Sequence, residues 1–273
     1  MTTDSSGSTG TTGTTGTTVT TGGTGASGST GTVEYGAFSF IDSPAVVEAL
    51  GATGLSWLCL DAQHGRWDDA GVLAALDLAG GAATGAGGRA RILVRPRAAD
   101  FGLIGRALDA GAAGVIVPMV DGVEDARRVV DAAYYPPIGR RSWGPIRSPY
   151  GAPSDVEAAN DGVLVAIMIE TLGALAAVDE IAALPGVDML FVGPFDLSAA
   201  LGTTVDALLA DGSADAPLAR VATAAAAAGV RFGAFAGGPE RAAAFAAHGA
   251  DFITLTSDTD ALALGAATTL ART

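Results

Sequence analysis

The most constraining feature of this sequence is a regular alternation of two kinds of segment from Val33 to the C-terminus. Short runs of β-branched and aliphatic residues alternate with Ala- and Leu-rich segments that have the period of a helix. The pattern predicts strands over residues 35–40, 57–63, 91–96, 114–120, 164–170, 189–193, 231–236 and 252–256. It predicts helices over residues 43–52, 68–78, 100–110, 123–133, 172–183, 205–228, 239–247 and 260–270.

Eight strand–helix units in this length favour an α/β fold of the (β/α)8 TIM-barrel type, which typically needs roughly 250 residues. The alternative is a doubly wound sheet, which has fewer strands and a Gly-rich turn after the first one. This chain has Ser43-Pro44 at that point instead. We therefore expect one barrel domain over residues 33–273. Residues 1–32 are almost entirely Thr, Gly and Ser, so we expect a disordered tail with no assigned function.

Composition excludes several classes of function. All 15 basic residues are Arg, so Schiff-base, pyridoxal-phosphate and P-loop mechanisms, which need a lysine, are excluded. The net charge of −14 leaves no basic face for nucleic acid. No run is apolar enough to span a membrane, and the N-terminus does not resemble a secretory signal. We expect a cytoplasmic protein that binds neither nucleic acid nor membrane.

The same composition limits the choice of metal site. One cysteine, Cys59, and two histidines, His64 and His248, exclude a disulfide, a cysteine-based zinc site and a three-histidine zinc centre. A metal would be held mainly by carboxylates, which favours Mg²⁺ or Mn²⁺. Cys59 lies inside a predicted strand and is interpreted as a core residue. His248 comes late in a predicted helix and is interpreted as structural.

In such a barrel the chemistry gathers where the strands end. Asp61, His64, Arg95, Glu170 and Asp196 all follow or close predicted strands. Glu170 and Asp196 close neighbouring strands, and two close carboxylates would repel each other unless a divalent cation lies between them. The alternative is that Glu170 pairs with a barrel arginine and Asp196 caps a helix that starts at Leu197. These residues by themselves leave both interpretations open.

His64 follows Asp61 by three residues, so the carboxylate could orient the imidazole and make it a better base. Arg95 ends an apolar strand, where its charge needs an anion from the protein or the substrate. Arg97 is expected to face solvent or a neighbouring subunit. The long segment 135–147, which follows the fourth predicted strand and helix, carries three Arg and a Trp and suggests a lid or a subunit contact.

The motifs WLCLDAQHG, ILVRPR, ALDAG, GVIVPMV, YPPIGRRSWGP, IMIET and FVGPFDLSAALG occur in this order. With them, residues from about Tyr35 onward resemble the HpcH/HpaI aldolase family of metal-dependent pyruvate aldolases. The resemblance implies Glu170 and Asp196 as ligands of Mg²⁺ or Mn²⁺, with Co²⁺ as a further candidate. It implies His64 as the base, partnered by Asp61, and Arg95 as the group that binds the enolate oxygen.

The resemblance further implies a 2-oxo acid substrate and a homo-oligomer, a hexamer built as a dimer of trimers that exchange the last helix. The expected substrate-binding residues are Arg95, Met168, Gly193 and Phe195. Asp109, in ALDAG, matches another acidic position near the family's site.

Three positions depart from the pattern: Met168 stands where many relatives have Gln, Phe195 where many have Ala, and Gln63 where some have Glu. The first two make the expected substrate pocket more apolar. Two alternative functions stay open. One is an enolate-forming lyase of the citrate lyase β type that acts on an acyl-CoA, and the other is an inactive barrel with a binding role.

Overall fold

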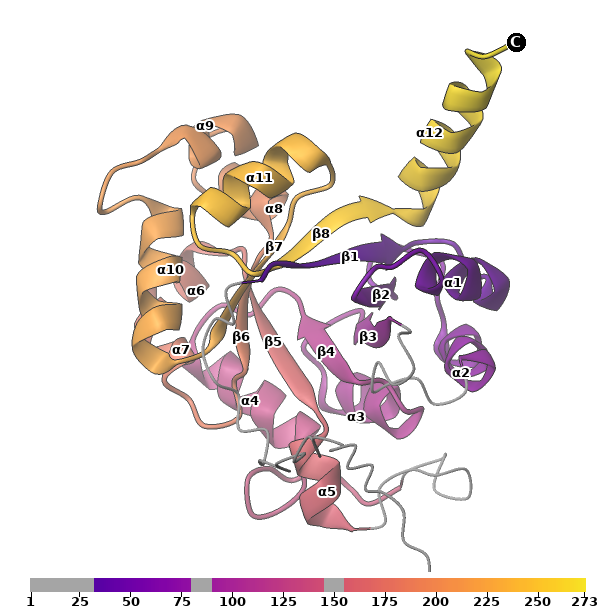
Figure 1. The fold of residues 1–273 in the computed structure, drawn as a ribbon. Helices are drawn as coiled ribbons and strands as arrows, with labels where there is room; N and C mark the ends of the chain where they lie inside the picture. Colours follow the sequence, from indigo (N-terminus) through magenta and orange to yellow (C-terminus); the bar gives the residue numbers. More distant parts are fainter. Residues whose placement is uncertain (1–31, 80–89, 145–154) are drawn as a thin grey trace, which may run out of the picture.

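The computed structural model describes residues 32–79, 90–144 and 155–273, so the predicted tail, apart from Thr32, lies outside the described residues. Eight parallel strands close a barrel in sequence order (Figure 1). The strands are β1 (Glu34–Ser39), β2 (Trp57–Asp61), β3 (Arg91–Arg95), β4 (Gly114–Val117), β5 (Leu164–Ile169), β6 (Met189–Val192), β7 (Arg231–Phe235) and β8 (Phe252–Ser257). The predicted TIM barrel is confirmed, and the doubly wound alternative is wrong.

Helices surround the barrel and connect its strands. They are α1 (Pro44–Gly51), α2 (Asp69–Leu78), α3 (Phe101–Asp109), α4 (Val123–Ala133), α5 (Val156–Asp161), α6 (Leu172–Ala176), α7 (Val178–Ala182), α8 (Pro194–Ala200), α9 (Val205–Ala210), α10 (Pro217–Ala228), α11 (Pro239–Ala247) and α12 (Asp258–Leu270). None of the described helices is both long and apolar enough to cross a membrane.

Two predicted helices are interrupted. The segment 205–228 forms α9 and α10, because Asp211 takes an extended conformation and Pro217, which has no N–H, begins a new helix. The segment 172–183 forms α6 and α7, which meet at Ala177. The chain also forms two short helices, α5 and α8, that the periodicity does not predict.

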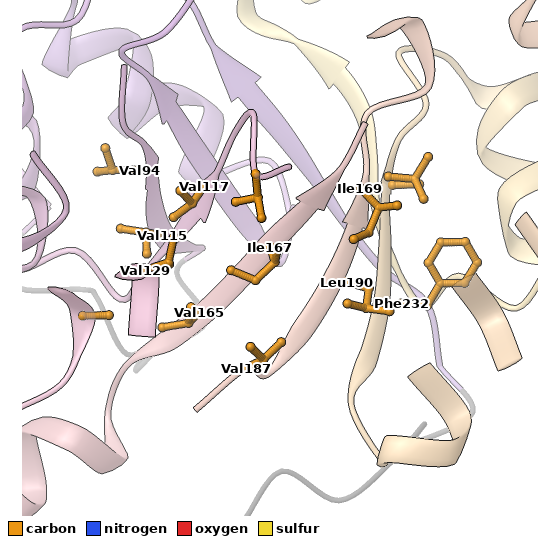
Figure 2. Close-up of a cluster of buried hydrophobic side chains, with 14 of the residues drawn as sticks. Val94, Val115, Val117, Val129, Val165, Ile167, Ile169, Val187, Leu190 and Phe232 are labelled. Atoms are coloured by element: carbon orange, nitrogen blue, oxygen red, sulfur yellow. The ribbon is translucent and has the colours of Figure 1, made fainter. Parts of the chain in front are cut away.

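The strands alternate between two apolar layers. Outward side chains such as Val115, Val165 and Leu190 pack under the helices, as Figure 2 shows. Inward side chains such as Phe38, Trp57 and Phe191 fill the barrel itself. Since side chains on a strand alternate with a period of two, every second residue of each strand faces the barrel interior. This alternation decides which polar residues at the strand ends can meet.

The carboxyl rim, where the eight strands end, is the side on which each following helix begins. Residues 135–144 follow α4, and helices run back toward the strand starts, so these residues lie at the opposite end of the barrel. The described part of the segment therefore does not form the predicted lid over the chain's own site. The prediction of a subunit contact stays untested, and residues 145–147 lie outside the described residues.

The last helix, α12, projects away from the barrel (Figure 1). Its leucines Leu262, Leu264 and Leu270 are 56 %, 70 % and 72 % exposed. Its one buried residue is Asp258, at the start of the helix. A helix whose leucines are this exposed among the described residues is unusual for a folded domain, because burial of apolar surface supplies most of a helix's stability.

Asp258 joins the end of β8 to the end of β1. Its carboxylate is buried and accepts hydrogen bonds from Ser39 Oγ at 2.8 Å, from the Phe40 amide at 3.0 Å and from the Ile41 amide at 2.8 Å. These contacts close the barrel at the carboxyl rim, where the last strand meets the first.

The Asp258→Ala variant is expected to unfold more easily, because it leaves three donors without an acceptor. We expect its free energy of unfolding to fall by about 2–4 kcal/mol. Chemical denaturation measures this loss. Asp69→Ala is the control, because Asp69 forms only an exposed pair with Arg106 and its loss should cost much less. Equal losses in the two variants would contradict the proposed closure.

Candidate active site at the carboxyl rim

A buried ion pair crosses the barrel wall at the carboxyl rim. Asp61 and Arg95 are the last residues of β2 and β3, and they lie directly opposite each other in the strand register. The Asp61 carboxylate accepts from Arg95 Nε at 2.8 Å and from Nη2 at 2.5 Å. Asp61 is fully buried and Arg95 almost so. Burial lowers the pKa of Arg95, but the hydrogen bonds and charge of Asp61 outweigh this effect and raise the pKa above its ordinary value.

Arg95 also lies over an aromatic ring. Its guanidinium carbon is 5.1 Å from the ring centroid of Phe38, which projects into the barrel from β1. A guanidinium at this distance from a ring face is attracted by the negative charge density of the face. Nε and Nη2 are occupied by Asp61, and Nη1 is the group left to meet a ligand.

Asp61 also shapes the turn that carries His64. Asp61 Oδ1 accepts from the backbone amides of Gln63 at 2.9 Å and His64 at 3.2 Å. Gly65 allows the turn to stay tight, because a Cβ there would lie 2.3 Å from the Asp61 carbonyl oxygen. His64 is exposed. Asp61 therefore holds the backbone of His64, whereas we expected it to orient the imidazole, and its carboxylate faces Arg95 instead.

Glu170 follows β5 and turns its carboxylate inside the rim. Oε1 accepts from the Met119 amide at 2.7 Å, whereas Oε2 is buried and has no hydrogen-bond partner among the described residues. Burial raises the pKa of Glu170 above its ordinary value. The charge of Asp196 adds to this rise, while the Met119 amide and Arg95 oppose it. Among the described residues Glu170 pairs with no arginine, so this alternative for Glu170 is not supported.

Gly193 leaves the space that the Glu170 carboxylate fills. A Cβ on Gly193 would lie 2.3 Å from Glu170 Oε2 and 2.9 Å from Met168 Cε. Met168 is buried and belongs to the apolar layer inside the barrel. The predicted substrate-binding residues Met168 and Gly193 thus lie against Glu170, and the methionine makes this part of the site apolar.

Asp196 and Phe195 lie in the first turn of α8, directly after Gly193. The helix begins at Pro194, so Asp196 lies inside it. The prediction that Asp196 caps a helix starting at Leu197 is therefore wrong. Both side chains are exposed, and Asp196 is near enough to Glu170 to affect its pKa.

The donor set at the rim fits a divalent cation of the Mg²⁺ or Mn²⁺ type. The unpartnered, buried Glu170 Oε2 is an oxygen ligand in need of a positive charge, and Asp196 is a second carboxylate beside it. Among the described residues no three His, Cys, Asp or Glu side chains are grouped to hold a metal. A cation here would therefore take its remaining ligands from water and substrate.

Three other residues singled out in the sequence lie outside this cluster. Cys59 is buried inside the barrel, and burial raises the pKa of its thiol well above the ordinary value, which disfavours a nucleophile. The His248 ring contacts the Leu209 carbonyl oxygen at 2.9 Å and ends α11, so its structural interpretation is supported. Asp109 ends α3 at the other end of the barrel and pairs with Arg141 at 2.6 Å.

Sequence reasoning missed the contribution of Met119. Its backbone has a φ of +57°, which belongs to the left-handed conformation that residues other than glycine rarely adopt. In this conformation its amide donates to Glu170. The VPMV segment carries no glycine that would signal such a turn, so only the tertiary structure reveals it.

Gly193→Ala is expected to displace the Glu170 carboxylate, because the new Cβ would overlap Oε2. We expect the affinity for Mn²⁺, measured by calorimetry, to fall by about tenfold or more, the loss typical of a disturbed ligand environment. Gly105→Ala in α3 is the matched control, since a Cβ there meets nothing within 4 Å. Similar Mn²⁺ affinities in both variants and the parent would contradict this account.

Comparison with known proteins identifies relatives of this chain. The family model described as HpcH/HpaI aldolase/citrate lyase matches residues 34–264. A hydroxypyruvate/pyruvate aldolase of Paraburkholderia phytofirmans is 35 % identical over 231 residues, which cover 82 % of this chain and 86 % of that protein. A 2-dehydro-3,6-dideoxy-6-sulfogluconate aldolase of Pseudomonas putida is 39 % identical over 176 residues, 61 % of this chain and 64 % of that protein.

Solved structures show the same relationship. A crystal structure of an HpcH/HpaI aldolase/citrate lyase family protein from Burkholderia cenocepacia superimposes with a TM-score of 0.78. It is 31 % identical in sequence, and the match covers 88 % of this chain and 94 % of that one. The chain described here therefore belongs to the HpcH/HpaI aldolase/citrate lyase family.

Proposed function

We propose that this protein is a metal-dependent aldolase that cleaves 4-hydroxy-2-oxo acids into pyruvate and an aldehyde. The observation that carries the proposal is the buried, unpartnered oxygen of Glu170, which lies near Asp196 and the Arg95–Asp61 pair on one rim. Relatives named as pyruvate aldolases support it. The absence of lysine fits as well, because a cation takes the place of the Schiff base as the electron sink.

Glu170 and Asp196 would hold the cation, which when bound supplies a Lewis acid for the carboxylate and keto oxygens of the substrate. Arg95 Nη1 donates to the oxygen that becomes negative as the C3–C4 bond breaks. Because Asp61 holds Arg95 in place beforehand, the guanidinium stabilises the developing enolate without reorganising.

His64 removes the proton from the 4-hydroxyl group of the substrate, and the electron pair of that bond forms the aldehyde carbonyl. The C3–C4 bond breaks, its electrons pass into the pyruvate enolate, and C3 of the enolate then takes up a proton to give pyruvate. His64 is suited to this role because it is exposed at the rim and its backbone is fixed by Asp61. Met168, Gly193 and Phe195 line the substrate pocket in this proposal, and the first and last make it more apolar.

The proposal is tested by following pyruvate release from a panel of 4-hydroxy-2-oxo acids with a coupled dehydrogenase. Protein stripped with EDTA should be inactive and should recover activity when Mn²⁺ or Mg²⁺ is added. His64→Ala should lower kcat by about 10²–10⁴-fold, the range for loss of a general base. Glu170→Gln should abolish the response to the metal.

His248→Ala is the matched control for the first variant. The His248 ring contacts the Leu209 carbonyl oxygen of α9, so its removal should leave kcat unchanged. No pyruvate from any substrate, with folded protein that binds Mn²⁺, would overturn the aldolase assignment. The acyl-CoA lyase would then be tested with CoA thioesters.

We further propose a cytoplasmic homo-oligomer, a hexamer, in which α12 packs against another subunit. The support is the helix itself, whose leucines Leu262, Leu264 and Leu270 are all exposed among the described residues. In this arrangement the barrel of each subunit stays complete, because Asp258 remains in place at the start of the helix.

A chain that ends after Asp260 is expected to sediment as a smaller assembly than the full protein. Asp258 and its three contacts are kept, so circular dichroism should still report a folded barrel. A double variant, Leu262→Glu with Leu264→Glu, should have the same effect without shortening the chain. A monomeric parent protein, or an unchanged mass in both variants, would contradict the exchange of the last helix.

A further inference from the structure

A second arginine lies at the carboxyl rim, on the side of the barrel away from β2 and β3. Arg241 is in the first turn of α11, which follows β7, and Phe195 is in the first turn of α8, which follows β6. The guanidinium carbon of Arg241 lies 5.5 Å from the Phe195 ring centroid. Since Phe195 directly precedes Asp196, this arginine lies near the helix turn that carries a proposed cation ligand.

A row of aromatic rings connects Arg241 with Arg95. The ring centroids of Phe195 and Phe235 are 6.1 Å apart, and those of Phe235 and Phe38 are 5.1 Å apart, both edge to face. Phe38 in turn lies under Arg95. The row therefore has a cation at each end, of which Arg95 is buried and Arg241 is partly exposed.

The two arginines differ in how firmly they are held. Arg95 donates two hydrogen bonds to the buried Asp61. Loss of this contact would leave both buried charges without a partner. Among the described residues the ion-pair partner of Arg241 is Asp206, at 3.2 Å, and the Asp206 side chain is 81 % exposed. Exposed ion pairs of this kind contribute little, so an incoming anion can replace Asp206 at small cost.

Two other arginines follow strand ends, but their surroundings differ. Arg97 lines a cleft between α2 and α3 on the outside of the barrel. Arg66 is exposed in the turn after His64. Of these three described arginines, Arg241 is the one that has both an exposed ion-pair partner, Asp206, and a neighbouring ring, Phe195.

We propose that Arg241, supported by Phe195, is a specificity residue that binds an anionic group at the far end of the aldehyde. The group is a carboxylate, sulfonate or phosphate, whose oxygens a guanidinium binds through paired hydrogen bonds. The 2-oxo acid end of the substrate lies near Arg95, and its far end lies near Phe195 and Arg241. This inference rests on the proposed aldolase function.

The test compares two aldehydes of the same chain length as acceptors for pyruvate, the anion 4-oxobutanoate and neutral butanal. The parent protein should have the higher kcat/KM for 4-oxobutanoate. Arg241→Met should lower kcat/KM for 4-oxobutanoate by about tenfold, within the range for loss of a charged contact, and leave butanal within about twofold. Arg241→Lys, which keeps the charge, should restore much of the preference.

Arg106→Met is the matched control. Arg106 forms a similar exposed pair with Asp69 and lies in the second half of α3, away from the rim. Its substitution therefore removes the same charge without changing the site. A binding measurement supports the kinetics: calorimetry with succinate, an unreactive dianion, should show weaker binding to Arg241→Met than to Arg106→Met. Equal effects of Arg241→Met on both aldehydes, or none, would overturn the inference.

A third readout separates this inference from the proposed function. Exchange of the pyruvate methyl protons in D2O, followed by NMR, requires the enolate but no aldehyde. Exchange in every variant, with no difference between the two aldehydes, would overturn only the role of Arg241. No exchange in the parent protein would overturn the aldolase function itself.

Discussion

The buried pair between Asp61 and Arg95 is the interaction on which the arrangement of the site depends. A buried ion pair gains little net stability, because the loss of hydration offsets the attraction. This pair does more than hold two strands together, since it presents Arg95 Nη1 on a fixed frame and ties down the turn that carries His64. The positions of the proposed base and of the enolate-binding group therefore follow from one carboxylate.

The two ends of the barrel handle their charges differently. At the end where the strands begin, Glu34 contacts both Arg91 and Arg231, and both arginines lie over the Phe252 ring, which stacks on Trp57 at 4.1 Å. These three charged side chains are all paired, and the rings of Trp57 and Phe252 fill the interior beside them. At the carboxyl rim Glu170 Oε2 is left without one among the described residues. This contrast marks the rim as the end built to receive a ligand.

Much of the site was predictable because polar residues at the ends of apolar strands are costly unless something meets them. Glu170 and Arg95 stood out for this reason, and the structure brings both to the rim. The partners were less predictable. Asp61 lies 34 residues before Arg95 in the sequence. It becomes the partner of Arg95 only because β2 and β3 pair in this register. The Met119 amide reaches Glu170 only through a left-handed turn that its sequence does not signal.

The sequence by itself determined the barrel, its eight strand–helix units and the residues at the strand ends, because hydrophobic periodicity is a local property of the chain. Only the tertiary structure decided which of those residues face one another, since register and closure depend on contacts between distant segments. It brought Arg241 beside Phe195 from separate helices, and it placed residues 135–144 at the far end of the barrel. It also left the leucines of α12 exposed among the described residues, because the helix projects away from the barrel that it follows.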